Sequence, residues 1–132
     1  MGAAEYAEAA RRGYKAFQEN DVETLQQVLA PDVKWHGTGR NQTAGDFDGL
    51  DATLGSFLNL AQLTNGTFGV EVHDVLASDD HAVVLATSKG ERNGKTLESN
   101  YCHIFHFNDS GQVSEAWVVP VDPYAGDDFF AD

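Results

Sequence analysis

The sequence predicts an α+β fold in which helices precede an antiparallel sheet along the chain. Three segments within the first 66 residues repeat apolar side chains every three or four positions, which is the spacing of one helical face. From residue 67 onward, apolar residues alternate with polar ones, as they do in half-buried strands. Because the helices and strands are segregated rather than alternating, the α+β class is favoured over α/β.

The first helix is expected over residues 3–19. Its apolar residues fall on one face and are Ala3, Tyr6, Ala7, Ala10, Gly13, Tyr14 and Phe17. Asp21 is placed to cap a second, shorter helix that ends before Pro31. A third helix is expected to start behind an N-cap at Asp48 and to end near Asn65-Gly66. Its apolar face consists of Leu50, Leu54, Phe57, Leu58 and Ala61.

A short strand is expected over residues 33–36. It is followed by a predicted loop over residues 37–49, which contains four glycines. Four longer strands are expected over residues 67–76, 82–88, 96–107 and 112–119. Asn93-Gly94 is a residue pair typical of a two-residue hairpin turn. Because the turns between the last three strands are short, these strands should form an antiparallel meander. A single domain is expected over residues 1–132.

Composition disfavours several classes of function. The chain has 132 residues and a net charge of −13, which argues against nucleic acids and anionic membrane surfaces as partners. Cys102 is the lone cysteine, so neither an intramolecular disulfide nor a cysteine zinc site is expected. The sequence has no HExxH motif and no glycine-rich phosphate loop, so it predicts neither a metal nor another cofactor. No stretch has the length of a membrane span and no signal peptide is evident, so a cytoplasmic location is expected.

The strand segment SNYCHIFHF, residues 99–107, contains the strongest functional candidate. Alternation divides it into two faces, one with Tyr101, His103 and Phe105, the other with Cys102, Ile104 and His106. A neutral imidazole offers one donor and one acceptor and titrates near pH ~6.5, which suits proton transfer. His103 is therefore a candidate acid/base group or hydrogen-bond donor. The alternative is a core histidine bonded to a backbone carbonyl or to Tyr101.

Several local sequences resemble those of the nuclear transport factor two-like superfamily, in its SnoaL-like and ketosteroid isomerase-like branch. They are YKAFQEND at 14–21, LAPDV at 29–33, GLDA at 49–52, FHFNDSGQV at 105–113, and an ending with Trp117 and DPY at 122–124. The resemblance covers nearly the whole chain. It implies a cone-shaped, cystatin-like roll in which three N-terminal helices and a curved antiparallel sheet enclose an apolar pocket. It also implies a homodimer through the outer sheet face; alternatively, the tail with Phe129 and Phe130 covers that face.

Catalytic residues of the ketosteroid isomerases transfer only in part to this sequence. The resemblance places His103 where these enzymes have a protonated aspartate that donates to the developing oxyanion. Their general-base aspartate corresponds to Gly37, which follows His36. Their donor tyrosine corresponds to Gly13, which precedes Tyr14.

The SnoaL-like cyclases offer a second set of correspondences. Their acid/base aspartate corresponds to Val118, and the nearest aspartate in this chain is Asp122. Tyr101 lies two residues before His103 and is expected to orient it or to donate to a substrate carbonyl. Arg92 lies beside a hairpin turn and is expected to be solvated. The residues expected to contact a ligand are Trp35, Phe57, Phe105, Trp117 and Val118.

Together these features predict a cofactor-independent enzyme acting on a small, apolar, oxygenated molecule such as a ketone or polyketide-like compound. The reaction would be a proton transfer of the isomerase, cyclase or dehydratase (lyase) type. The catalytic candidates are His103, Tyr101, His36, Tyr14 and Asp122. One alternative is a non-catalytic domain that binds a small hydrophobic ligand in the same pocket. Another is a scaffold that has no ligand at present.

Overall fold

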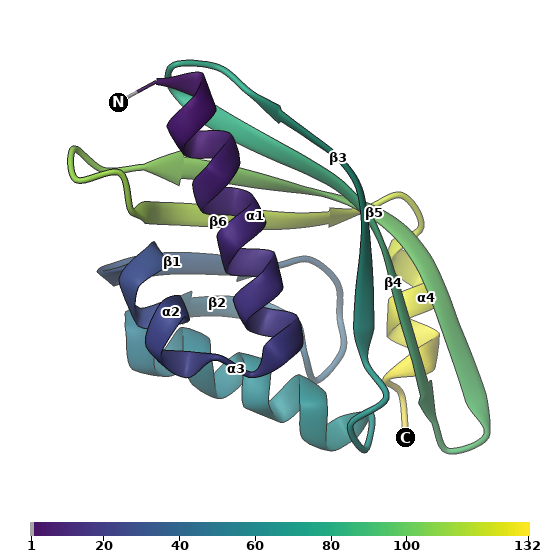
Figure 1. Cartoon of the computed structure of the whole chain (residues 1–132). Helices are drawn as coiled ribbons and strands as arrows, with labels where there is room; N and C mark the ends of the chain where they lie inside the picture. The colour runs from purple at the N-terminus through teal and green to yellow at the C-terminus, as the bar shows by residue number, and fades with distance from the viewer. Residues whose placement is uncertain (1) are drawn as a thin grey trace.

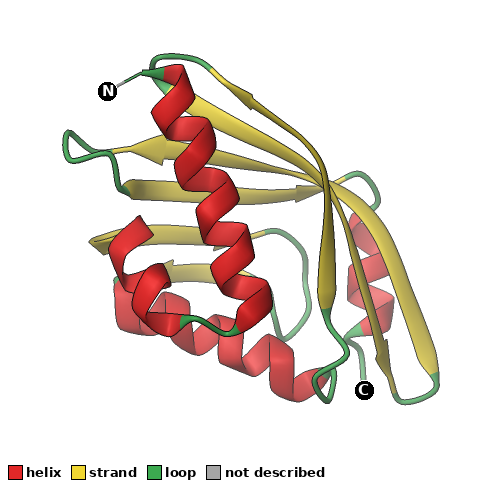
Figure 2. Cartoon of the chain, viewed as in Figure 1, coloured by secondary structure: helices red, strands yellow, loops and turns green. Residues whose placement is uncertain are grey.

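The computed structural model describes residues 2–132 and contains, within them, four helices and six strands (Figures 1 and 2). The helices are α1 (Ala3–Glu19), α2 (Val22–Val28), α3 (Leu50–Leu63) and α4 (Pro123–Phe129). The strands are β1 (Leu29–Gly37), β2 (Gly45–Asp48), β3 (Gly69–Ala77), β4 (His81–Arg92), β5 (Lys95–Phe107) and β6 (Val113–Pro120). The predicted α+β class is confirmed; Met1 of the expected domain lies outside the described residues.

The strands form one curved, unclosed sheet in the order β2-β1-β6-β5-β4-β3. The predicted antiparallel meander is confirmed, and it comprises the four consecutive strands β3 to β6. β1 runs parallel to β6, with Trp35 opposite Ala116. Because of this pairing, side chains from the first and last thirds of the chain lie on the same face of the sheet.

Helices α1 and α3 lie over one face of the sheet, which is called the inner face below (Figure 1). A spacing of four residues places Tyr6, Ala10 and Tyr14 on the buried side of α1. They belong to the same core as Val84 of β4 and Phe105 of β5. The apolar residues whose spacing predicts α1 are therefore the ones that pack against the sheet.

Local capping separates the first two helices. α1 stops at Asn20, which has the left-handed φ of 56° common at helix C-termini. Asp21 then caps α2 by accepting a hydrogen bond from the backbone N–H of Thr24, at 3.1 Å. The capping role predicted for Asp21 is confirmed.

The predicted loop over residues 37–49 is partly wrong, because residues 45–48 form the edge strand β2. Its sequence, GDFD, has one apolar residue and two aspartates, so it carries no strand signal. β1 begins at Leu29, four residues earlier than predicted. Asp48 ends β2 and does not cap α3, since the N-cap of α3 is Gly49.

Helix α4 was not predicted, so the expected three N-terminal helices are joined by a fourth at the other end of the chain. It is seven residues long, which is too short for a helical period to be recognised. Its start nevertheless follows ordinary rules, because Asp122 caps it and Pro123 occupies its first turn. α4 lies beside the β4–β5 hairpin (Figure 1). The hairpin turn predicted at Asn93-Gly94 is confirmed, since Arg92 pairs with Lys95 and the two turn residues have the positive φ values 52° and 78°. No helix within residues 2–132 has the length and apolarity needed to cross a membrane.

Candidate functional site

A cavity of about 210 Å³ lies between the inner face of the sheet and the helices. Four of the five predicted ligand contacts line it: Trp35, Phe57, Phe105 and Val118. Further aromatic residues in its wall, which were not predicted as ligand contacts, are Phe17, Phe47, Phe68 and Phe130. Within the described part of the chain, no aspartate, glutamate, lysine or arginine lines this cavity. Its chemistry therefore suits an uncharged and largely apolar ligand.

Three hydrogen-bonding side chains meet in the wall of the cavity. The hydroxyl of Tyr14, on α1, lies 2.5 Å from Nδ1 of His103 and 2.9 Å from the hydroxyl of Tyr101. Tyr101 and His103 are two residues apart on β5 and share its inner face, as predicted. The rings of Tyr101 and His103 have centroids 6.2 Å apart, but the hydrogen bonds that connect the two residues run through Tyr14. The side chains therefore form a chain in the order Tyr101, Tyr14, His103.

The other ring nitrogen of His103 has no hydrogen-bond partner. Nε2 is buried, and among the described residues it is the one buried side-chain nitrogen or oxygen atom without a partner. His103 as a whole is only 4% exposed. An unpaired buried polar group costs stability, so its presence in a cavity wall points to a ligand atom that completes the bond.

Burial keeps all three groups uncharged near neutral pH. It lowers the pKa of His103 to about 3, so the imidazole is neutral. It raises the pKa of Tyr101 to about 12 and holds the pKa of Tyr14 well above its ordinary value. The site therefore holds neutral donors and acceptors rather than a charged acid or base.

The direction of the hydrogen bonds decides what His103 presents to a ligand. A phenol is a better donor than a neutral imidazole N–H, and an imidazole nitrogen is a better acceptor than a phenol oxygen. We therefore assign Tyr101 as donor to Tyr14, and Tyr14 as donor to Nδ1 of His103. In this tautomer the proton is on Nε2, which leaves a buried, unpaired N–H donor on a residue that lines the cavity.

Aromatic rings hold the imidazole in place. The ring of Trp35 meets it edge-on, with centroids 4.7 Å apart and planes at 89°. Phe105, two residues along β5, lies 4.2 Å away on the same face of the strand. Phe57 of α3 packs in turn against Trp35, at 4.9 Å. These contacts fix the orientation of the ring.

Two predicted site residues lie on the opposite, outer face of the sheet. Trp117 was expected to contact a ligand, but it stacks on His36 with centroids 5.3 Å apart. Nδ1 of His36 lies 2.7 Å from the carboxylate of Asp46, and its Nε2 lies 2.7 Å from that of Glu115. The prediction that His36 and Trp117 belong to the pocket is therefore corrected. Their neighbours Trp35 and Val118 line the cavity instead, because adjacent strand residues point to opposite faces.

We expect His36 to titrate above the ordinary pH range of a histidine. Hydrogen bonds that its ring donates to the carboxylates of Asp46 and then Glu115 favour the charged imidazolium and raise its pKa. An NMR titration should place this pKa above 6.5, and Asp46→Asn should lower it. Asp48→Asn is the control, because Asp48 lies in the same strand opposite Lys34. Identical His36 titrations in the two variants would contradict this assignment.

Asp122 also lies outside the cavity. It is exposed, and its carboxylate accepts a hydrogen bond from the backbone N–H of Tyr124, at 3.1 Å, as the cap of α4. Its candidacy as a catalytic base is therefore corrected. No group of three or more metal-binding side chains is found within residues 2–132. Of the five catalytic candidates, the fold brings Tyr14, Tyr101 and His103 together.

The fold and the cavity define a class of protein. A curved, unclosed sheet with helices on its inner face, enclosing an apolar cavity, is the architecture of the nuclear transport factor two-like proteins. A family model described as a SnoaL-like domain matches residues 10–116. The chain therefore belongs to the SnoaL-like family, which confirms the resemblance noted from its local sequences.

Relatives and solved structures agree with this assignment. The uncharacterized protein Rv0034 of Mycobacterium tuberculosis is 30% identical over 122 residues, which are 92% of each chain. The structure of Bal32a, from a soil-derived mobile gene cassette, is 35% identical with a TM-score of 0.94 and covers 98% of both chains. A putative SnoaL-like polyketide cyclase from Jannaschia sp. is 16% identical with a TM-score of 0.77, covers 90% of this chain and 87% of that one, and is similar in fold alone.

Proposed function

We propose that this protein is a cofactor-independent enzyme whose substrate is a small, uncharged, mostly apolar molecule with a ketone or related oxygen. The observation that carries the proposal is the buried and unpaired Nε2 of His103 in an apolar cavity wall. Around it stand Trp35, Phe57 and Phe105, which would contact the apolar body of the substrate. The reaction is a proton transfer of the isomerase, cyclase or dehydratase type.

In this mechanism His103 polarises the substrate oxygen. Its Nε2–H donates to the carbonyl, and the bond strengthens as an adjacent C–H loses its proton and negative charge develops on the oxygen. Tyr14 and Tyr101 stabilise the required tautomer through Nδ1. Because no carboxylate lines the cavity within residues 2–132, the proton passes to a water molecule or to a second oxygen of the substrate. Substrates with acidic C–H groups, such as 1,3-dicarbonyl compounds, fit this requirement.

The second candidate function is a binding domain without catalysis. It is favoured by the absence of charged residues from the cavity lining in the described chain and by the lowered pKa of His103, which makes the imidazole a weak base. The same residues would then hold an apolar ligand by one hydrogen bond and aromatic contacts. Binding alone requires no proton acceptor.

A paired binding and turnover experiment separates the two. A panel of ketones and polyketide-like 1,3-dicarbonyl compounds would be tested by quenching of tryptophan fluorescence in Trp117→Phe, which leaves Trp35 as the one tryptophan, and by mass spectrometry of products. For an enzyme, His103→Gln should lower turnover about 100-fold while changing the dissociation constant far less. Ligands that bind tightly to the wild type and are never converted would instead support the binding domain.

We also propose that the protein is a homodimer. A group of apolar side chains lies on the outer face of β3 to β6, namely Leu76, Val83, Leu85, Cys102, Ile104, Trp117 and Val119. Leu85 and Val119 are 38% and 39% exposed, which supports a partner on this face. The alternative, that the tail covers it, is wrong, because Phe129 and Phe130 pack with Leu97 instead.

Leu85→Glu should separate the two subunits. It places a charge within the apolar surface of the outer face, where the partner would have to desolvate it. Sedimentation equilibrium should give twice the 14.3 kDa chain mass for the wild type and the chain mass itself for the variant. Gln26→Glu, at an exposed position of α2, is the matched control for added charge. A wild-type protein that sediments as a monomer would contradict the dimer.

A further inference from the structure

The last twelve residues, Val121–Asp132, close one end of the cavity and are called the C-terminal segment below. Pro123, Gly126 and Phe130 of this segment line the cavity directly. Phe129 and Phe130 are only 3% and 6% exposed and belong to a small apolar cluster separate from the main core. Displacing this segment would therefore open the cavity without disturbing the packing of α1 on the sheet.

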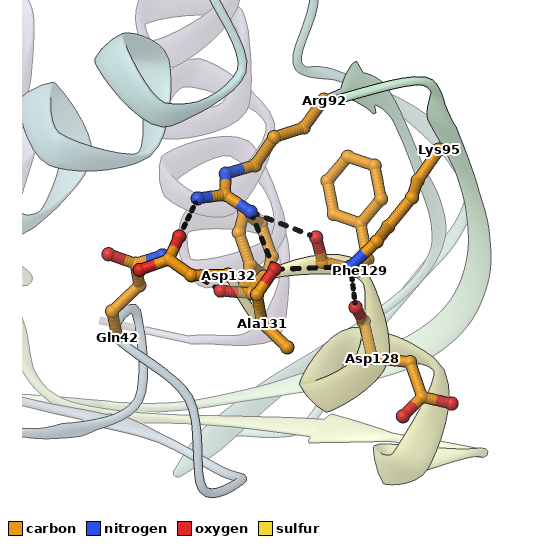
Figure 3. Close-up of polar contacts among 8 residues, drawn as sticks. Gln42, Arg92, Lys95, Asp128, Phe129, Ala131 and Asp132 are labelled. Carbon is orange, nitrogen blue, oxygen red and sulfur yellow. Dashed lines mark hydrogen bonds and ion pairs between the residues drawn. The ribbon is translucent and has the colours of Figure 1, made fainter.

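Two cations of the β4–β5 hairpin hold the segment in place (Figure 3). The guanidinium of Arg92 donates to the carbonyl oxygen of Ala131 at 2.9 Å and to that of Phe129 at 3.4 Å. It also lies 2.5 Å from the carboxylate of Asp132. Lys95 donates to the carbonyls of Asp128 and Ala131, at 2.7 and 3.1 Å. The carbonyls at the end of α4 thus find their partners on the hairpin.

Arg92 is not solvated, which corrects the sequence-based expectation. Its side chain is 8% exposed, and its three partners all belong to the C-terminal segment. Lys95, by contrast, is an exposed residue. Of the two cations, Arg92 is therefore the one whose buried position depends on the closed segment.

The loop between β1 and β2 holds the opposite side of the segment. The carboxylate of Asp127 accepts bonds from the backbone N–H of Arg40 and the side chain of Asn41, each at 2.8 Å. Gln42 donates to the carbonyl of Phe130 at 2.8 Å. Gly39 has a φ of +128°, and a Cβ there would lie 2.7 Å from the Asp127 carboxylate. This loop is therefore shaped for close approach to α4.

The contacts of the segment differ in kind from those of the sheet. The strands are held by hydrogen bonds to neighbouring strands, whereas α4 is a helix of seven residues that contains Gly126, and glycine weakens a helix. Val121, which precedes the helix, and Tyr124 within it are 80% and 75% exposed. Two phenylalanines and a set of polar contacts hold it. Segments with few buried apolar contacts open at lower free energy than the fold as a whole.

We propose that the C-terminal segment is a lid that opens to admit the ligand, and that Arg92 is the positioning residue that holds it closed. Phe130 is then the part of the lid that faces the ligand. The proposal rests on the proposed function insofar as it requires an apolar ligand in the cavity. The opening itself is a property of the protein alone.

Stopped-flow binding of the uncharged fluorescent probe N-phenyl-1-naphthylamine tests the lid. Arg92→Met should raise the association and dissociation rate constants together by about tenfold, and change their ratio by less than about threefold. Arg92→Lys should restore slower rates in part, because one donor to the carbonyls remains. Lys95→Met should act in the same direction as Arg92→Met and serves if that variant does not fold. Lys89→Met is the control, since Lys89 pairs with Glu71 away from the segment.

Hydrogen exchange supplies a readout that needs no ligand. In Arg92→Met the amides of residues 124–130 should exchange about tenfold faster or more, while those of β5 are unchanged. Selective exchange without any probe binding would support the lid and count against the proposed function. Probe binding with unchanged rate constants and unchanged exchange in Arg92→Met would overturn the lid and leave the proposed function standing. Faster exchange throughout the chain would also overturn it, since Arg92 would then be a general structural contact.

Discussion

Replacing His103 with leucine should remove function without removing stability. Turnover of the substrate should fall about 100- to 1000-fold, because the oxygen loses its donor in the transition state. The free energy of unfolding at pH 7 should change by less than about 1 kcal/mol, since the lost acceptor of Tyr14 is offset by the exchange of a buried polar atom without a partner for an apolar side chain. Urea unfolding followed by tryptophan fluorescence, together with the turnover assay, measures both quantities.

Function and stability are expected to respond differently because the two ring nitrogens of His103 have different surroundings. Nδ1 accepts a bond from Tyr14, and that bond is lost in His103→Leu. Tyr14 still accepts the bond from Tyr101, at 2.9 Å, so its hydroxyl keeps one partner although its proton loses its acceptor. Nε2 has no partner to lose. A histidine satisfied on both sides by the protein would behave differently, because its removal would leave buried groups unpaired on both sides with no unpaired atom removed in return.

Val84→Ala is the matched control for a substitution in the same core. Val84 is fully buried and lies opposite His103 on β4. Its truncation should cost roughly 2 kcal/mol of stability, with the donor to the substrate still in place. A loss of 2 kcal/mol or more in His103→Leu would support the alternative reading of His103 as a structural core residue.

Alternation along the strands was the most reliable guide to the site. Applied strictly, it also excludes some of the residue combinations that were proposed for the pocket. It placed Tyr101, His103 and Phe105 together on the inner face. Applied to β6, the same rule states that Trp117 and Val118 cannot both face the cavity. The sequence alone does not say which of the two faces inward, because both are apolar. Pairing with β1 decides it, and this pairing joins segments about 80 residues apart.

Contacts between distant elements were the part that the sequence could not predict. Tyr14 was identified on the apolar face of α1, but packing and cavity lining require the same periodic pattern. Its bond to His103 spans 89 positions and depends on how α1 crosses the sheet. Phe17 was likewise placed on the apolar face of this helix by its spacing, and only the structure shows that it lines the cavity. Arg92 was expected in solvent because it lies beside a hairpin turn, and α4, the short helix that covers it, gave no periodic signal.

Acid should destabilise this protein between pH 6.5 and 4, chiefly through His103. The folded pKa of about 3 is below the ordinary value of 6.5, so in this range the unfolded chain binds a proton that the folded chain does not. Stability is then full above pH 6.5 and is lost as the pH falls toward the folded pKa. At pH 4 the loss should be about 3 kcal/mol, since each pH step below 6.5 contributes about 1.4 kcal/mol.

Other groups with shifted pKa values act outside this window. The raised pKa of His36 stabilises the fold below pH 6.5, and that contribution is lost as the pH rises through the folded value. Hydrogen bonds lower the pKa values of Asp21 and Asp127 from about 3.8, and an ion pair with Arg92 lowers that of Asp132. The stability that they contribute is lost at more acidic pH. The interval from pH 6.5 to 4 therefore reports on His103.

A comparison of variants isolates this contribution from the net charge of −13, whose self-repulsion weakens on acidification in every variant alike. Urea unfolding at several pH values should show the loss between pH 6.5 and 4 in the wild type and in His36→Gln. It should be absent in His103→Leu, because the side chain that titrates differently in the two states is gone. His36→Gln should instead flatten the profile above pH 6.5. Parallel profiles for the wild type and His103→Leu below pH 6.5 would mean that His103 has the same pKa in the folded and unfolded chain, which would contradict the lowered pKa assigned to it.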